Sequence, residues 1–449
     1  MATTGQQQKL LEEVRNRVET EYQKKTPKGA GIMEKAYRVL PGGDTRRSIF
    51  FFPYPLWIKN ADGCHLWDED GNQYLDFHNC YTVMMLGHGN PAVKAAMKSA
   101  IDEGTTALGA FKSSVVRWAD ILCERLVSFD QVRFTNTGSE AIMLAIRAAR
   151  AFTGKDKIIM EEGGYHGCYD AVVFPPDSNG LPTSLMKDTI IVPHNDNAAL
   201  EQAIMENRGQ VAALVLEGLM GAAGMIPPAD GYLEFARKIT AEYDILFIQD
   251  EIITFRLDQG GMQHLKGIRP DLTTVGKIVA GGTPGAAFGG RRDIMQQFSP
   301  EAPRVHHAGT LNANPLTAAA GVAQLEQTTP ELIDRLNALG ESLANGIRTI
   351  FARNGIRAQV TGMGSLMNVH FSPVPIVDGR TAREQSNKDV LHLFHLSLVN
   401  HGILTPERGM FCISAPMSDK EIRAALDAVE DVIIDLKPYI VELWPDLSV

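Results

Sequence analysis

A lysine and two carboxylates stand beside short apolar segments, where polar residues are uncommon. Lys277 lies within TTVGKIVAGG, Asp250 follows ILFIQ, and Glu217 follows ALVL. A partly buried amine near other cations has a lowered pKa, which makes it a usable nucleophile and proton carrier. A lysine that only extends its ammonium group to solvent is the alternative. A buried carboxylate at Asp250 suits a protonated ring nitrogen, although an N-cap or a structural ion pair would use the same residue.

The turn TNTGS, residues 135–139, joins an apolar strand to a helix and has the residue types of a phosphate site. Thr137, Gly138 and Ser139 stand where the first N–H groups of the helix lack partners. The dipole of the helix favours an anion at the same place. A plain N-cap at Thr137 or Ser139, with Glu140 in the first turn, explains the same residues. The turn alone does not decide between the two interpretations.

The segment GGYHG places an aromatic ring and an imidazole after another strand. Tyr165 suits stacking on a planar ring, or packing in the core or an interface. His166 is better interpreted as a hydrogen-bonded structural histidine than as a base. The carboxyl ends of parallel strands meet at one edge of an open sheet, so these groups would gather there. Such a gathering is improbable by chance, and we interpret Lys277 as a lysine that binds a cofactor.

The apolar segments alternate with helical patterns and predict an α/β fold. Short, almost wholly apolar strands between helices are typical of a mostly parallel sheet covered on both faces. Residues 8–40 are predicted as helix and residues 56–77 as a small meander. We expect residues 1–75 to belong to a small lobe, 76–330 to form the large cofactor-binding domain, and 331–449 to form the α+β small domain.

The composition argues against several classes of protein. A net charge of −10 disfavours a nucleic-acid or anionic-membrane surface, and the apolar runs are too short to span a bilayer. The five cysteines are scattered, and the twelve histidines show no HExxH spacing, so neither a disulfide framework nor a metal site is expected. The polar N-terminus lacks a secretory signal pattern. These features predict a cytoplasmic protein.

Together these motifs make the chain resemble the class III pyridoxal-phosphate aminotransferases of fold type I. The segments DEIITFRL and PDLTTVGKIVAGGTPGAAFGGRRDIM are similar to that family's aspartate and lysine segments. The segments TNTGSEA, GGYHG and HAGTLNANPLTAAAG are similar to its phosphate, stacking and dimer-contact segments. The resemblance implies pyridoxal 5′-phosphate as cofactor, with Lys277 as its Schiff-base lysine. It also implies a homodimer in which Thr310 reaches the phosphate in the neighbouring subunit.

Two subgroups of this family are compatible with the chain. One contains β-amino-acid aminotransferases such as β-phenylalanine aminotransferase, and the other contains glutamate-1-semialdehyde aminomutases. Gly218 stands where many members have proline, and the loop after Asp250 reads TFR, one residue shorter than the usual TGFR. This short loop and the short segment with Pro175 and Pro176 resemble the first subgroup more. We therefore expect transamination of a β-amino acid with a keto-acid acceptor such as 2-oxoglutarate; an aminomutase or amine transaminase is the alternative.

An acidic substrate requires a cation, and the resemblance points to Arg46 and Arg408. A guanidinium group can hold a carboxylate through two parallel hydrogen bonds. Arg47 is better explained as a surface residue. Tyr81 is expected beside the substrate. The aromatic residues after Arg47 would either wall a substrate pocket or fill the core, and these are Phe51, Phe52, Tyr54 and Trp57.

Overall fold

The structure is a computed structural model that describes residues 5–173, 179–301 and 303–449. Its helices are α1 (Gly5–Lys25), α2 (Pro27–Val39), α3 (Asn79–Thr82), α4 (Pro91–Asp102), α5 (Ser113–Arg125), α6 (Gly138–Thr153), α7 (Asn197–Glu206), α8 (Tyr232–Glu242), α9 (Gly261–Leu265), α10 (Arg292–Met295), α11 (Pro315–Gln327), α12 (Pro330–Asn354), α13 (Gly379–Gln385), α14 (Lys388–Asn400) and α15 (Asp419–Leu443). Its strands are β1 (Ile58–Asp62), β2 (His65–Asp68), β3 (Gln73–Asp76), β4 (Gln131–Thr135), β5 (Lys157–Glu161), β6 (Thr189–Val192), β7 (Val211–Glu217), β8 (Leu246–Asp250), β9 (Leu272–Val275), β10 (Ala286–Gly290), β11 (Gln359–Met363), β12 (Leu366–His370), β13 (Ile403–Leu404) and β14 (Met410–Cys412).

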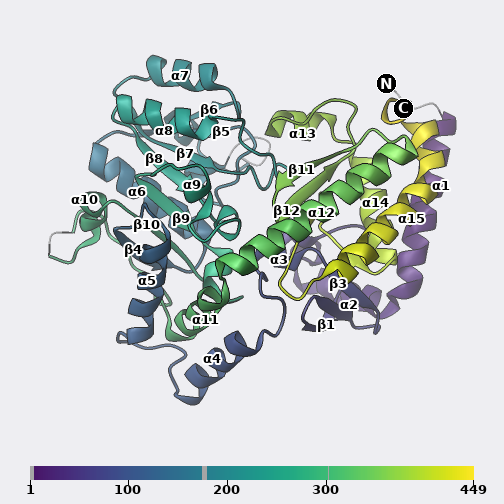
Figure 1. Cartoon of the computed structure of the whole chain (residues 1–449), viewed down its shortest axis with the longest axis horizontal. Coiled ribbons are helices and arrows are strands. Elements are labelled where there is room, and N and C mark those ends of the chain that lie inside the picture. Colours follow the sequence, from purple (N-terminus) through teal and green to yellow (C-terminus); the bar gives the residue numbers. More distant parts are fainter. Residues whose placement is uncertain (1–4, 174–178, 302) are drawn as a thin grey trace.

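A seven-stranded sheet forms the body of the larger part of the molecule (Figure 1). Its order is β4-β10-β9-β8-β7-β5-β6, and the strands from β9 to β6 are parallel. Both faces are covered: Ala213 and Val215 of β7 pack in the cluster that contains the apolar side of α6. Leu214 and Leu216 pack with α7 and α8 on the other face. The prediction of an α/β fold with a mostly parallel sheet is confirmed.

Strand β10 was not predicted, and it runs antiparallel between β4 and β9. Its sequence, AAFGG, has the composition of a loop. The glycines are required by close packing, because a side chain at Gly290 would collide with the backbone of Asp271 and one at Gly289 with that of Gln131. Small residues are therefore retained in a strand that propensity alone disfavours.

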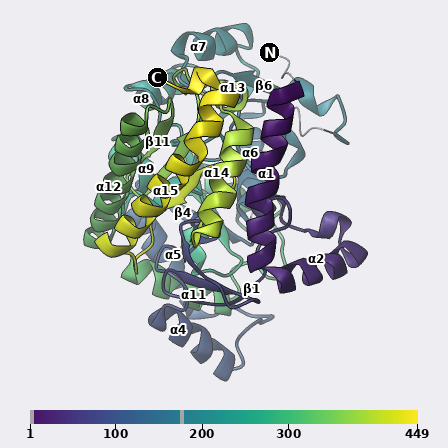
Figure 2. The ribbon, with the colours of Figure 1, turned by 90° about the vertical axis from the view of Figure 1, so that its right-hand side faces the viewer.

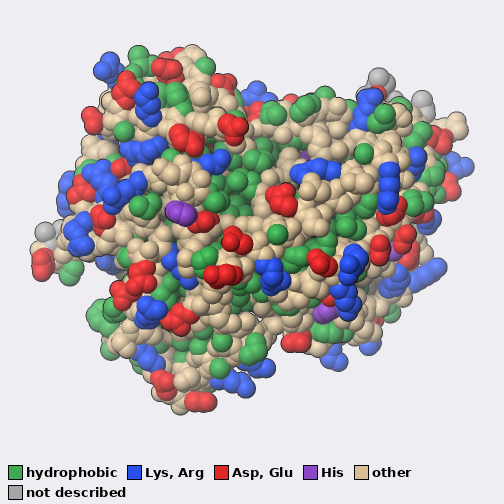
Figure 3. Space-filling view, viewed as in Figure 1, with side chains coloured by type: hydrophobic (Ala, Val, Ile, Leu, Met, Phe, Trp, Pro, Cys, Tyr) green, Lys and Arg blue, Asp and Glu red, His purple; other side chains and the backbone are tan. Residues whose placement is uncertain are grey.

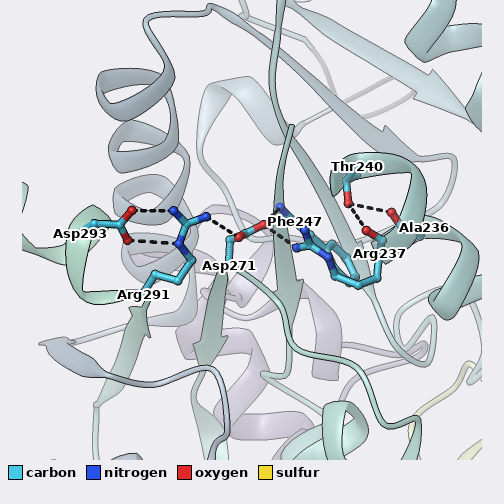
Figure 4. Close-up of polar contacts among 7 residues, drawn as sticks. All are labelled: Ala236, Arg237, Thr240, Phe247, Asp271, Arg291 and Asp293. Carbon is cyan, nitrogen blue, oxygen red and sulfur yellow. Dashed lines mark hydrogen bonds and ion pairs between the residues drawn. The ribbon is translucent and has the colours of Figure 1, made fainter. Parts of the chain in front are cut away.

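The edge of the sheet at the amino ends of the parallel strands carries an ion-pair network (Figure 4). The carboxylate of Asp271 accepts hydrogen bonds from Arg237 at 2.5 Å, from Arg291 at 2.9 Å and from the backbone N–H of Phe247 at 2.9 Å. A surface cleft of about 760 Å³ is lined by Arg237, Asp271 and Arg291. Lys277 follows the opposite end of β9, so this cleft is separate from the predicted site.

The smaller part of the molecule combines segments from both ends of the chain. Helix α1 packs against α14 and α15, and Figure 2 shows the three helices side by side. Strand β13 pairs in parallel with β3, which joins the N-terminal meander to the C-terminal region. Strands β11, β12 and β14 form a separate antiparallel sheet. The domain boundaries near residues 75 and 330 remain predictions.

The prediction of one helix over residues 8–40 is wrong in detail. Helix α1 ends at Lys25, and α2 begins at Pro27, which takes the first helical position because it has no N–H to donate. The interpretation of the aromatic run as a pocket wall is also not supported. Phe51 packs edge-on against Tyr22 in the core. The remaining members behave differently: Tyr54 is buried, Trp57 is half-buried and Phe52 is exposed.

Charged side chains of both signs are interspersed over the face shown in Figure 3, without a continuous basic area on it. Among the described residues, none of the helices is both long enough and apolar enough to cross a membrane.

Candidate active site

Lys277 lies directly after β9, at the carboxyl edge of the sheet. Its backbone has a φ of +51°, and its Nζ donates a hydrogen bond to the carbonyl oxygen of Tyr81 at 2.9 Å. The same nitrogen lies 5.4 Å from the centre of the Tyr81 ring. Burial lowers the pKa of Lys277, and the nearby Cys80, Asp250 and other acidic groups offset only part of this effect. The lysine therefore has the lowered pKa that the sequence analysis expected.

Asp250 ends the neighbouring strand β8 and is almost completely buried. Its Oδ1 accepts hydrogen bonds from the Ile252 N–H at 3.0 Å and the Thr274 hydroxyl at 3.2 Å. Its Oδ2 is hydrogen-bonded to His166 Nδ1 at 2.8 Å, and this is the only hydrogen bond that Oδ2 makes in the described part of the chain. One acceptor position on Oδ2 consequently remains open, because a carboxylate oxygen has two lone pairs.

His166 is the buried partner of Asp250 and not an exposed base. Burial lowers its pKa, but the hydrogen bond and charge of Asp250, together with Glu217 and Glu161, outweigh this effect and raise the pKa overall. Its Nε2 is buried and has no hydrogen-bond partner among the residues that the structure describes. The expectation of a structural, hydrogen-bonded histidine agrees with this geometry.

The turn at residues 135–139 begins helix α6. The Thr137 hydroxyl accepts a hydrogen bond from the Glu140 N–H at 3.2 Å, so the N-cap is present. The N–H groups of Gly138 and Ser139 have no acceptor within the described ranges. Gly138 allows a close approach, since a Cβ there would lie 2.8 Å from Ile252 Cδ1. The turn is thus held beside the Asp250 loop, with free amides at the start of a long helix.

Tyr165 and Glu217 are linked at the same edge. The backbone N–H of Tyr165 donates to Glu217 Oε1 at 3.0 Å. The Tyr165 side chain is 56% exposed, so its ring is available for stacking. Burial raises its pKa to about 12, so the phenol is neutral at physiological pH. The Ser139 hydroxyl accepts a hydrogen bond from the Cys168 N–H at 3.1 Å, which ties the phosphate turn to the loop that carries Tyr165.

A left-handed turn next to Lys277 was not predicted. The four residues of α3, from Asn79 to Thr82, all have φ between +48° and +74°. Such a conformation costs about 1–2 kcal/mol per residue for residues other than glycine. Asn79 donates to the Cys412 carbonyl at 2.6 Å, and the buried Arg256 donates to the Thr82 carbonyl at 3.1 Å. These bonds hold the Tyr81 carbonyl against Lys277, and no local sequence signal indicates the turn.

Arg46 and Arg408 approach this region from different segments and are exposed. Arg46 Nη2 lies 3.6 Å from Cys80 Sγ. Arg408 Nη1 donates to the Ala222 carbonyl at 3.3 Å, and its charge lowers the pKa values of both Tyr81 and Tyr165, although burial raises both overall.

Arg47 and Thr310 are exposed, and within the described chain their side chains form no hydrogen bond or ion pair with the other predicted site residues. The segment that carries Thr310 nevertheless lies beside the phosphate turn, because Asn136 donates to Asn312 at 2.8 Å. Pro175 and Pro176 lie outside the described residues.

The residues at this edge fit pyridoxal phosphate. Asp250 Oδ2 has an open acceptor position for a ring N–H, and the free amides of Gly138 and Ser139 suit a phosphate group. Asp250 pairs in register with Thr274, three residues before Lys277, so the carboxylate and the amine come from adjacent strands. Cys80, Thr274 and Arg256 also belong to this region but were not predicted as site residues. Of the three, only Arg256 had a sequence signal, because it lies in the unusually short loop.

Comparisons with protein families and with known proteins agree on one family. The family described as aminotransferase class III matches residues 52–433. A glutamate-1-semialdehyde 2,1-aminomutase from Methanothrix thermoacetophila is 39% identical over 87% of this chain and 92% of its own length.

Two solved structures are also similar. A β-phenylalanine aminotransferase from Variovorax paradoxus has a TM-score of 0.90 and 32% identity, covering 95% of this chain and 98% of its own. An omega-transaminase from Sphaerobacter thermophilus has a TM-score of 0.87 and 36% identity, covering 91% and 97%. The chain belongs to the class III aminotransferase family of fold type I enzymes, whose cofactor is pyridoxal phosphate.

Proposed function

We propose that this enzyme moves an amino group on a carboxylate-bearing substrate and that Lys277 is its acid–base residue. The observation that carries this proposal is the position of Lys277 Nζ, at 2.9 Å from the Tyr81 carbonyl and at the same sheet edge as the buried Asp250. Arg46 and Arg408 lie near this region and supply two cations for carboxylates. Amines without a carboxylate should therefore be poorer substrates.

Each residue has a distinct part in this proposal. Bound pyridoxal phosphate supplies an electron sink for the substrate carbon that loses a proton. Asp250 would hold the proton of the ring nitrogen, and Tyr165 would stack on the ring. The amides of Gly138 and Ser139, with the Thr137 hydroxyl, would hold the phosphate. Lys277 removes the proton from the substrate carbon and returns it, which its lowered pKa favours.

An aminomutase of the glutamate-1-semialdehyde type is the first candidate for the overall reaction. The curated relatives that support it are 35–39% identical to this chain and cover 87–92% of it. They favour this reaction over the β-amino-acid transamination expected from the sequence. An aminomutase uses one substrate and needs no external keto acid.

Transamination of a β-amino acid with 2-oxoglutarate is the second candidate. The loop that follows Asp250 is short, and its Arg256 is fully buried between the Thr82 carbonyl and Cys412 Sγ, at 3.1 and 2.8 Å. This loop is the feature that the sequence analysis associated with β-amino-acid enzymes. The omega-transaminase and the β-phenylalanine aminotransferase among the solved structures also favour transamination, and the name of the second includes a β-amino acid.

Turnover with one substrate and no acceptor separates the two candidates. The purified holoenzyme is incubated with glutamate-1-semialdehyde alone, and separately with (S)- or (R)-β-phenylalanine with and without 2-oxoglutarate. Sustained conversion of the single substrate supports the aminomutase. Conversion of β-phenylalanine that requires the keto acid supports the transaminase. Failure of both, with a panel of 3-aminobutyrate, alanine and 1-phenylethylamine also unreactive, would refute the proposal.

A homodimer with shared active sites is proposed from the exposed segment beside the phosphate turn. Thr310 and Leu311 are exposed there, and Phe111, after α4, has no shielding from its own chain. We propose that another subunit covers these exposed apolar side chains, as subunit interfaces cover exposed apolar patches on other proteins. Light scattering after size exclusion should give twice the mass of the 49.1 kDa chain. A Phe111→Asp variant should shift toward the monomer, and a monomeric wild-type protein would contradict the assignment.

A further inference from the structure

Glu217 connects two loops at the active-site edge through its two carboxylate oxygens. It ends β7, a strand whose residues are all buried, and its side chain is 4% exposed. Oε1 accepts a hydrogen bond from the Tyr165 N–H at 3.0 Å, and Oε2 accepts one from the Gly221 N–H at 3.0 Å. A single buried carboxylate thus holds the backbone of both loops, at Tyr165 and at Gly221.

The two loops carry or contact different residues that we propose act on substrate and cofactor. The first carries the Tyr165 ring. In the second, the residue after Gly221 is Ala222, whose carbonyl accepts the hydrogen bond from Arg408 at 3.3 Å. The second loop is also hydrogen-bonded to β11 in the smaller part of the molecule, because the Thr361 hydroxyl donates to the Gly224 carbonyl at 2.6 Å. Because Ala222 follows Gly221 directly, a displacement of Gly221 would move the Ala222 carbonyl and with it the Arg408 guanidinium.

We propose that Glu217 is a positioning residue that sets the Arg408 guanidinium relative to the Tyr165 ring, and that its ionised form is needed for tight binding of carboxylate-bearing substrates. This inference rests on the proposed role of Arg408 as a carboxylate-binding residue. An ionised carboxylate accepts both N–H groups in charge-assisted bonds, which are about twice as strong as bonds between neutral groups. A neutral Glu217 would hold at least one of the two loops less firmly.

Because of the groups around Glu217, its ionised fraction changes with pH near neutrality. Burial and the charge of Asp250 raise the pKa of Glu217, while His166 and the two backbone N–H groups lower it, and the result is about 7. Glu217 interacts electrostatically with four charged or titratable groups at this edge of the sheet, which are His166, His194, Asp250 and Lys277. Because the pKa is raised, the ionised fraction decreases as the pH falls through about 7.

The test measures binding and not turnover, so it is independent of which reaction the enzyme catalyses. Glutarate and 3-phenylpropionate carry carboxylates but no amino group, and their Kd values for the holoenzyme are measured by calorimetry from pH 6.0 to 8.5. We expect the wild-type Kd to rise about tenfold toward pH 6.0, as expected for the loss of one charge-assisted hydrogen bond. Glu217→Gln should bind about tenfold more weakly at pH 8.5 and lose the pH dependence.

Glu251→Gln is the matched control. Glu251 is also fully buried and also accepts two backbone N–H groups, from Met262 at 2.8 Å and Gln263 at 2.9 Å. Among the described residues, it forms no hydrogen bond with either loop held by Glu217. The control should keep the wild-type pH dependence of glutarate binding. Arg408→Gln should remove that dependence, whereas Arg46→Gln should retain it.

Three outcomes would overturn the inference. The first is a wild-type glutarate Kd that does not change between pH 6.0 and 8.5. The second is an equal effect of Glu217→Gln and Glu251→Gln on glutarate binding and on cofactor affinity, which would indicate a merely structural role. The third is absence of measurable binding of both carboxylates to wild-type holoenzyme, which would remove the role of Arg408. Failure of the proposed reaction appears instead in the turnover assays.

Discussion

The substitution Asp250→Asn tests the central electrostatic contact of the site. Asparagine keeps the shape of the side chain, and its carbonyl oxygen can still accept from Ile252 and Thr274. Its amide, however, faces His166 Nδ1 at the position that now lies 2.8 Å away, and it cannot accept the proton of a cofactor ring. The change therefore removes one negative charge from a buried site without opening a cavity.

The expected magnitude follows from the burial of this charge. Two unit charges about 3 Å apart at an effective dielectric constant of about 20 attract by about 5 kcal/mol. Removing one member of a buried pair typically costs about 3–5 kcal/mol. If this stabilisation is fully expressed in the step that removes the substrate proton, the rate of that half-reaction falls by about 150- to 5000-fold.

Single-turnover absorbance measurements with a saturating amino donor give this rate, after the cofactor content of the variant has been matched to wild type. Asp271→Asn is the control, because Asp271 is a buried aspartate at the opposite edge of the same sheet. It should lower thermal stability but change the half-reaction less than about threefold, as expected for a site remote from the chemistry. A fully loaded Asp250→Asn enzyme within tenfold of wild type would refute the assignment.

Three further predictions concern protonation and substrate charge. Because burial lowers the pKa of Lys277, the rate of the half-reaction should rise with pH and level off below about 10.4, the ordinary value for lysine; a profile still rising at that pH would contradict it. The pKa of His166 is raised because the folded protein stabilises its protonated form. This contribution to the free energy of unfolding is complete below about pH 6.5 and is lost as the pH rises through the folded-state pKa. Urea unfolding of the apoenzyme should show that His166→Gln lacks this pH-dependent component, and identical pH dependence in both proteins would exclude it. Arg46→Ala should raise KM more for acidic donors than for neutral amines, and an equal rise would remove its substrate role.

Parts of the site were predictable from sequence because they depend on local patterns. Apolar strands that end in Asp250 or Glu217, and a glycine turn that opens a helix at Gly138, are short-range features. The rule that parallel strands present their carboxyl ends together then places these residues and Lys277 at one edge. The small residues of β10 carried no such pattern, since their identity is determined by the backbone of neighbouring strands.

The amino-acid sequence by itself determined the α/β class and the family, and it indicated the residues that we propose bind the cofactor, because apolar periodicity and turn chemistry act over a few residues. Only the tertiary structure decided that the Tyr81 carbonyl meets Lys277, that Cys80 lies beside Arg46, and that Glu217 bonds to two separate loops. These contacts join segments far apart in the chain. They depend on a left-handed turn and on loops whose conformations are held by packing, which no local preference specifies.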